Sequence, residues 1–282
     1  MPLSKQEWLA LEKKAHELRR LCLDTTYWAG SGHIGGGMSV MDMLTVLYHK
    51  YMRLDVKNPK WEDRDRFILS KGHAGIAYAP VLVDFGWNDP EQLKTFNHTN
   101  SKMGIHLDSN KVVGVDASTG SLGHGLPVCV GMALAGKMDK KDYRVYTVMG
   151  DGELAEGSVW EGAMSAGNYK LDNLCAIVDN RLQISGNTED VMKQDSQEER
   201  WAAFGWNVLS VPGNDMDALV HAFELAKHCK GKPTVIIANT TKGCGSSVME
   251  NKAEWHHKVP TPAEYDQIIA DFAARKEAAL HE

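Results

Sequence analysis

Apolar runs alternate with stretches of helical periodicity along this chain, most clearly in its middle third. Residues 144–149 form a short apolar, β-branched run that stops at Gly150-Asp151-Gly152, which predicts a buried strand ending in a glycine turn. Residues 158–169 place apolar positions on one helical face, and residues 174–178 are again continuously apolar. Strand, helix and strand in this order predict a right-handed crossover between two parallel strands.

The rest of the chain predicts the same alternation. Ser4 and Glu7 have the spacing of a capping box and start an amphipathic helix that ends near Gly30, and Thr261 starts the last helix in the same way. The glycine-rich segment 31–37 is interpreted as a loop between two helices. Further elements are expected as helices over 38–51, from 76 onward, over 126–136 and over 216–228, as strands over 67–70, 207–211 and 234–238, and as a surface loop or short helix over 187–200.

Two oxygen-bearing side chains follow neighbouring predicted strands. Asp151 stands at the end of the first strand, and Asn180 at the end of the next. Ligands of open parallel sheets bind at this edge, and neighbouring strands lie only ~4.8 Å apart. A carboxylate and an amide oxygen are hard ligands that suit Mg²⁺ bound to phosphate. The pair therefore predicts a magnesium–diphosphate site, although a Gly-Asp-Gly turn alone is more often only a turn.

Composition excludes several classes of protein. The 282 residues can form one domain, and 43% hydrophobic and 24% charged residues are ordinary for a globular protein. A net charge of −6 argues against nonspecific binding to nucleic acid or to an anionic membrane. The five cysteines are an odd number without a C-x-x-C pair, and no run approaches ~18 apolar residues, so we expect a cytoplasmic protein without disulfides or a spanning helix.

Histidines are numerous and unevenly placed. Four of the twelve lie in predicted helices and receive no role: His16, His49, His221 and His228. In contrast, His33, His73 and His124 each follow a glycine at an element boundary, where a side chain can reach a crevice.

These segments resemble the thiamine diphosphate signature, in which Gly-Asp-Gly is followed by Asn somewhat under thirty residues later. The resemblance implies that the metal is held by the side chains of Asp151 and Asn180 and by the backbone carbonyl of Leu182. Six segments also stand in the order found in the amino-terminal half of transketolases: Ser31-Gly32-His33, 69–73, His106-Leu107-Asp108, 118–123, Gly150-Asp151-Gly152 and Glu254-Trp255-His256. The chain is therefore similar to that family from about residue 18 to residue 257, with an α/β thiamine diphosphate-binding fold, a mostly parallel central sheet and helices on both faces.

The resemblance also implies roles for single residues. The positions of His33 and His256 contact the reacting centre, His73 lies by the cofactor diphosphate, as His256 also does, and His106 lines the substrate channel. The residues implied to bind thiamine diphosphate are His73, Gly120, Ser121, Leu122, Gly150, Asp151, Gly152, Glu153, Asn180 and His256. The metal is Mg²⁺ or another divalent cation such as Ca²⁺ or Mn²⁺, and Glu156 is expected to face the partner's cofactor-binding acid.

Three positions depart from the family pattern. His124 stands where glutamine is usual, His257 stands where glycine is usual, and Gly35-Gly36-Gly37 replaces a common Gly-Ala-Pro. All three are expected near the substrate channel, so they bear on the choice of substrate and leave the cofactor unaffected.

The resemblance implies a partner. Residues 1–282 are interpreted as a single domain with an amino-terminal helical segment and without the pyrimidine-binding domain that such enzymes need. We therefore expect a split transketolase that transfers a two-carbon ketol unit between sugar phosphates and is active only with a carboxyl-terminal subunit, in an assembly with two copies of each chain. The alternatives are a subunit of deoxyxylulose phosphate synthase or of a 2-oxo acid dehydrogenase, or a non-catalytic diphosphate-binding module.

Overall fold

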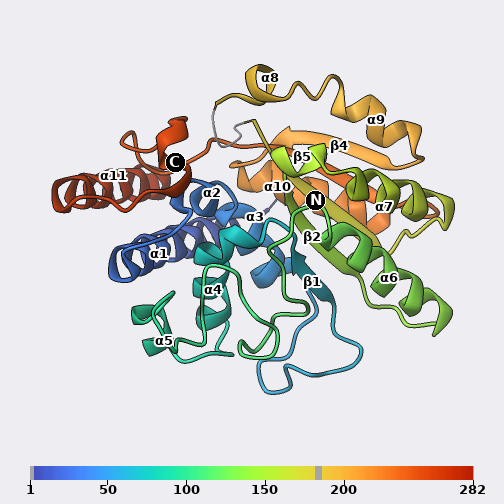
Figure 1. Ribbon diagram of the computed structural model, residues 1–282, viewed down its shortest axis with the longest axis horizontal. Helices are drawn as coiled ribbons and strands as arrows, with labels where there is room; N and C mark the ends of the chain where they lie inside the picture. Colours follow the sequence, from blue (N-terminus) through green and yellow to red (C-terminus); the bar gives the residue numbers. More distant parts are fainter. Residues whose placement is uncertain (1–2, 182–185, 282) are drawn as a thin grey trace.

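The computed structural model describes residues 3–181 and 186–281 (Figure 1). Within these residues one sheet has the strand order β1-β2-β3-β5-β4, and every neighbouring pair is parallel. The strands are β1 (Arg66–Leu69), β2 (Val145–Gly150), β3 (Leu174–Asn180), β4 (Asn207–Pro212) and β5 (Thr234–Asn239). The predicted α/β fold with a parallel sheet is confirmed.

Helices cover both faces of this sheet (Figure 1). One face carries α1 (Lys5–Ala29), α2 (Ile34–Ser39), α3 (Met41–Val46), the π-helix η1 (Leu47–Tyr51), α4 (Gly75–Asp84) and α10 (Met216–His228). The other face carries α6 (Gly125–Met138), α7 (Gly157–Asn168) and α9 (Gln197–Ala203). The remaining elements are η2 (Gly72–Ala74), α5 (Glu91–Lys94), η3 (Gly152–Ala155), α8 (Thr188–Val191), η4 (Ala253–His257) and α11 (Pro262–His281).

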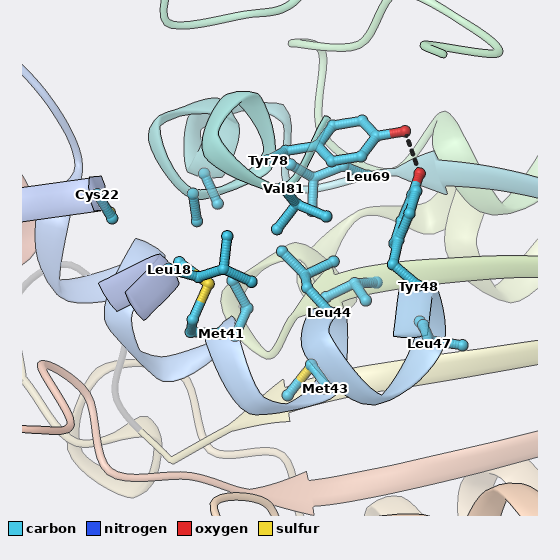
Figure 2. Close-up of a cluster of buried hydrophobic side chains, with 14 of the residues drawn as sticks. Leu18, Cys22, Met41, Met43, Leu44, Leu47, Tyr48, Leu69, Tyr78 and Val81 are labelled. Carbon is cyan, nitrogen blue, oxygen red and sulfur yellow. Dashed lines mark hydrogen bonds between the residues drawn. The ribbon is translucent and has the colours of Figure 1, made fainter. Parts of the chain in front are cut away.

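Alternation along the strands divides the core into two layers. In β2, Tyr146 and Val148 join the cluster with α1, α3 and α4, whereas Val145 and Met149 join the cluster with α6 and α7. Both sets are buried because helices cover both faces, which explains why the strands read as continuous apolar runs. Figure 2 shows part of the first layer, where the hydroxyls of Tyr48 and Tyr78 lie 2.7 Å apart in a hydrogen bond.

Both predicted capping boxes are present. The backbone N–H of Glu7 donates to Ser4 Oγ, and the Glu7 carboxylate accepts from the Ser4 backbone, at the start of α1. The same reciprocal pair joins Thr261 and Glu264 before α11. Each pair satisfies two backbone N–H groups that a helix start would leave free.

The expectation that residues 31–37 form a loop is wrong from Ile34 onward, because α2 begins there. Glycine disfavours helix, but this helix is fully buried and lies against other backbone. A Cβ on Gly35 would lie 2.6 Å from the Trp255 carbonyl oxygen, and one on Gly37 would lie 3.0 Å from Ile76 Cγ2. The glycines therefore allow close packing between α2 and its neighbours, and tertiary contacts outweigh the low helix propensity.

Candidate functional site

The site begins at the carboxyl ends of β2 and β3. Gly150 pairs with Asp179 in the parallel register, and the N–H of Asp151 donates to the Asp179 carbonyl at 3.1 Å. Asp151 and Asn180 each come one residue after this pair and therefore lie at the same edge, as the sequence predicts. The Asp151 carboxylate accepts hydrogen bonds from the N–H of Gly152 (2.9 Å) and of Arg181 (3.1 Å), and from the Thr188 hydroxyl.

Asp151 is 2% exposed and forms no ion pair with any residue in the described ranges. The Asn180 Oδ1 accepts from Gln197 Nε2 at 3.0 Å, and its Nδ2 donates to Asn239 Oδ1 at 2.9 Å. A buried carboxylate normally requires a cation or a metal beside it, so this donor pair fits a divalent ion. Leu182 lies outside the described residues, so the role of its carbonyl stays a prediction.

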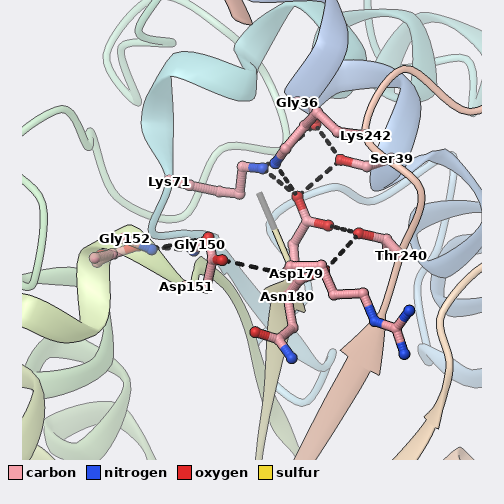
Figure 3. Close-up of polar contacts among 12 residues, drawn as sticks. Gly36, Ser39, Lys71, Gly150, Asp151, Gly152, Asp179, Asn180, Thr240 and Lys242 are labelled. Atoms are coloured by element: carbon pink, nitrogen blue, oxygen red, sulfur yellow. Dashed lines mark hydrogen bonds and ion pairs between the residues drawn. The ribbon is translucent and has the colours of Figure 1, made fainter. Parts of the chain in front are cut away.

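Next to this pair lies a buried cluster around Asp179 (Figure 3). Asp179 Oδ2 accepts from Lys71 Nζ at 2.5 Å and from Lys242 Nζ at 3.2 Å. Ser39 Oγ donates to the same oxygen at 2.8 Å, and the Thr240 hydroxyl donates to Oδ1. Burial alone would raise the pKa of Asp179, but the ammonium groups of Lys242 and Lys71 hold it well below its usual range.

Sequence reasoning missed this cluster. Two lysines face one carboxylate beside the predicted diphosphate position, and burial lowers the pKa of Lys71 while Asp179 opposes that shift. The lysines come from different segments, one before η2 and one after β5, and only the fold brings them together. The available signal was the acidic residue directly before Asn180, together with lysines in glycine-containing segments.

Glu153 joins three loops of the site. Its carboxylate accepts from the Ser70 hydroxyl and from the N–H groups of Gly123 (2.8 Å) and Gly150 (3.2 Å). The side chain is 2% exposed, and burial raises its pKa. All of these partners are protein groups, so the geometry favours a residue that fixes the loops, and direct contact with a cofactor stays a prediction.

Four imidazoles form a group that we call the histidine cluster: His33, His73, His256 and His257. The ring centroid of His33 lies 5.0 Å from that of His73, 5.2 Å from that of His256 and 4.6 Å from that of His257. The rings of His73 and His256 lie 5.5 Å apart. The structure therefore brings together three histidines that were predicted as catalytic and adds His257.

Three histidines of this cluster, His33, His73 and His256, are neutral at neutral pH. Burial lowers the pKa of His33 to about 4, and the neighbours His257 and His106 add to the effect. Burial lowers the pKa of His73 to about 2 and that of His256 to about 4, and nearby Lys71 contributes to both. A neutral imidazole can donate one hydrogen bond and accept another, which suits contacts to the oxygens of a substrate.

The glycine segment 120–122 lies beside this cluster. A Cβ on Gly120 would lie 3.3 Å from the His106 ring, and one on Gly72 would lie 2.6 Å from Thr119 Oγ1. The loops that carry His73 and His106 are therefore packed against Thr119 and Gly120, and cofactor binding by Gly120, Ser121 and Leu122 stays a prediction. His124 instead stands at the start of α6, with its Nδ1 lying 3.0 Å from the Leu122 carbonyl oxygen.

This arrangement defines a thiamine diphosphate-binding type of site, and the comparisons with known proteins agree. The family model described as "Transketolase, thiamine diphosphate binding domain" matches residues 11–272. An apulose-4-phosphate transketolase subunit of Phocaeicola vulgatus is 45% identical over 268 residues, which is 95% of each chain. The 6-deoxy-6-sulfo-D-fructose transketolase subunit SqwG of a Clostridium species is 41% identical over 95% of this chain and 98% of that subunit.

Solved structures give the same result. The transketolase from Campylobacter jejuni has a TM-score of 0.88 and 32% identity, with 95% of this chain and 42% of that chain covered. The Leishmania mexicana transketolase also has a TM-score of 0.88, with 31% identity, 93% of this chain and 41% of that chain covered. The chain thus spans about two fifths of these longer enzymes.

The chain belongs to the transketolase family. Three relatives of matching length are named as transketolase subunits, and the chain is an amino-terminal transketolase subunit of this type. The matches favour this assignment over the alternatives that the sequence left open, namely a deoxyxylulose phosphate synthase or 2-oxo acid dehydrogenase subunit and a non-catalytic module.

Proposed function

We propose that this chain, with a separate carboxyl-terminal subunit, transfers a two-carbon ketol unit from a ketose phosphate donor to an aldose acceptor with thiamine diphosphate and Mg²⁺. The observation that carries the proposal is the placement of Asp151 and Asn180 on neighbouring strand ends, beside the lysines and the histidine cluster. When bound, thiamine diphosphate supplies the carbanion chemistry that protein side chains lack.

The metal is assigned to a pair of oxygen donors. No group of three or more His, Cys, Asp and Glu side chains gathers as a metal site in the described part of the chain. Mg²⁺ commonly uses one or two protein carboxylates or carbonyls and completes its shell with phosphate and water. Asp151 and Asn180 are assigned as two such ligands, and the Leu182 carbonyl, outside the described residues, stays a predicted third.

The diphosphate is assigned to the groups around Asp151 and Asn180, the two proposed metal ligands. Gly120, Gly150 and Gly152 carry no Cβ atom, so a phosphate can approach their backbone closely. Lys71 and Lys242 both contact the Asp179 carboxylate, and their N–H groups are donors of the kind that bind phosphate oxygens.

The histidines are assigned to the sugar. We infer that His33 and His256 stabilise oxygens of the reacting substrate, that His106 lines the approach, and that His73 lies near the diphosphate. The lowered pKa values of His33, His73 and His256 keep these rings neutral, so each can hold or release a proton at a substrate oxygen without carrying a fixed charge.

The partner is a carboxyl-terminal subunit with a pyrimidine-binding domain, in an α2β2 assembly. Its docking face is assigned to α6 and α7, which both begin at site loops. Lys137 is the one charged residue of α6, yet Val128 is 43% exposed and Met138 is 74% exposed, and Met164 on α7 is 57% exposed. A helix that is apolar on every side normally requires a covering surface, and interface cores are poor in charge.

Several further points support the proposal. Glu156 is exposed at the start of α7, where it can meet the partner's acid. No described helix has the length and apolarity that crossing a membrane requires. All five cysteines are free thiols. The relatives named for apulose-4-phosphate and for a sulfosugar suggest a phosphorylated or otherwise acidic sugar as substrate.

The cofactor experiment uses the assembled enzyme. Mixing the chain with its partner subunit, thiamine diphosphate and Mg²⁺ is expected to give ketol transfer, whereas each chain by itself is expected to be inactive. In isothermal titration calorimetry Asp151→Ala removes cofactor binding, whereas Asp63→Ala, which breaks an exposed ion pair with Lys141, leaves it unchanged. Turnover by the lone chain, or unchanged binding by Asp151→Ala, contradicts the proposal.

The docking face has its own test. Met164→Glu places a charge on the assigned face and is expected to prevent assembly, as measured by size-exclusion chromatography with light scattering. Leu225→Glu is the matched control, because Leu225 is 44% exposed on α10, which covers the opposite face of the sheet. If both substitutions disrupt assembly equally, or if neither disrupts it, the partner docks elsewhere.

A further inference from the structure

His257 is the member of the histidine cluster to which the proposed reaction assigns nothing. It ends η4 directly after His256, and its side chain is exposed, whereas His33 is half-buried. Its ring meets that of His33 edge to face, at an interplanar angle of 72° and a centroid distance of 4.6 Å. Its Nε2 lies 3.5 Å from Ser31 Oγ, so it spans from the residue that precedes Gly32-His33 to the His33 ring.

Little else fixes the orientation of the His33 ring. Its Nδ1 is buried and has no hydrogen-bond partner among the described residues, and its side chain does not cap α2 although it stands at the N-cap. The ring is therefore held by packing against three other imidazoles, and the contact with His257 is the shortest of the three. Close packing selects one rotamer of a side chain that lacks hydrogen bonds, and removal of a packing neighbour makes other rotamers accessible.

We propose that His257 is a positioning residue for His33: it holds the His33 ring in the orientation that contacts the substrate and shields that ring from water. The inference rests on the proposed function, because it assumes that the His33 ring contacts the substrate. It also gives a physical meaning to the histidine that stands here in place of the usual glycine, since glycine offers no ring to pack on His33.

The charged groups around His33 support the same proposal. The groups that face its ring are Lys71 and His73 from the segment before α4, His106 from its loop, and His256 and His257 from η4. All of them are basic, and after burial His257 makes the largest contribution to the lowered pKa of His33. Removal of His257 therefore both loosens the ring and makes its protonation easier.

The first test uses the isolated chain and needs neither cofactor nor activity. Histidine ring carbons are labelled, and the His33 signal, identified by its absence in His33→Gln, is titrated by NMR. In His257→Gly the pKa of His33 is expected to rise by about one unit because burial and a nearby charge are both lost. His228→Gly, which removes an exposed histidine paired with Glu224 on α10, is expected to leave the titration unchanged.

The second test uses the assembled enzyme. His257→Gly is expected to lower kcat about tenfold without changing KM, because a displaced catalytic group affects the reacting state more than binding. His257→Phe keeps a ring against His33 and is expected to restore kcat. A raised KM with unchanged kcat would mean that His257 binds the substrate directly, and an unchanged His33 titration in His257→Gly overturns the proposal. If wild-type enzyme shows no ketol transfer, the proposed function fails, whereas the NMR result still decides whether His257 positions His33.

Discussion

Substitution of Asp179 is the most direct test of the charge arrangement at the site. The carboxylate is fully buried and accepts from Lys71, Lys242, Ser39 and the Thr240 hydroxyl. Asp179→Ala leaves two buried ammonium groups without their counter-ion, and breaking a buried pair in this way costs about 3–5 kcal/mol. This is a large part of the ~5–15 kcal/mol by which a typical domain is stable.

The matched control is Asp63→Ala. Lys141 Nζ lies 2.7 Å from Asp63 Oδ1, with the two side chains 37% and 44% exposed. An exposed pair of this kind contributes about 0–1 kcal/mol. Urea unfolding of both variants, followed by tryptophan fluorescence, gives the two losses in free energy of unfolding.

A second variant keeps the test decisive if Asp179→Ala does not fold. Asp179→Asn retains the size of the side chain and can keep its bonds to the hydroxyls of Ser39 and Thr240, but it still leaves the ammonium groups of Lys71 and Lys242 unpaired. We expect it to be destabilised, and the added substitution Lys71→Met to recover part of the loss because one uncompensated charge is then gone. A loss in Asp179→Asn no larger than that in Asp63→Ala would refute the reasoning.

Two further predictions concern packing and pH. Gly35→Ala is expected to destabilise the chain by about 1–3 kcal/mol, because the new Cβ would meet the Trp255 carbonyl oxygen at 2.6 Å, whereas Gly131→Ala, with nothing within 4 Å, is expected to be neutral or stabilising. Equal unfolding midpoints for these two variants would contradict the packing argument. Burial lowers the pKa values of His33, His73 and His256 below the ordinary 6.5. The unfolded chain therefore binds more protons below about pH 6.5, so stability falls as the pH is lowered toward 4, and a melting temperature constant between these values would show that the histidines are not buried in neutral form.

Much of the fold follows from local sequence patterns. The apolar runs 145–149 and 174–178 form most of β2 and β3, and all of these positions are buried because helices cover both faces of the sheet. The crossover rule then makes the strands parallel, which places Asp151 and Asn180 at one edge. This part of the site could be predicted because it depends only on element order and strand direction.

Other features could not be predicted from local pattern. Residues 34–37 contain three glycines and suggest a loop, yet they are helical because their missing side chains let α2 approach Trp255 and Ile76. The Glu153 carboxylate accepts hydrogen bonds from Ser70 and Gly123, which lie far from it in the sequence. In both cases the outcome depends on neighbours that are distant in sequence.

The sequence by itself determined the element order, the adjacent Asp151 and Asn180, and the set of histidines that carry the resemblance to transketolases. Only the tertiary structure decided that Lys71 and Lys242 converge on Asp179 and that His257 lies against His33. The physical reason is that strand direction and helix periodicity are set by neighbours a few residues away. A buried ion pair or a ring contact is set by the packing of elements that the chain brings together from far apart.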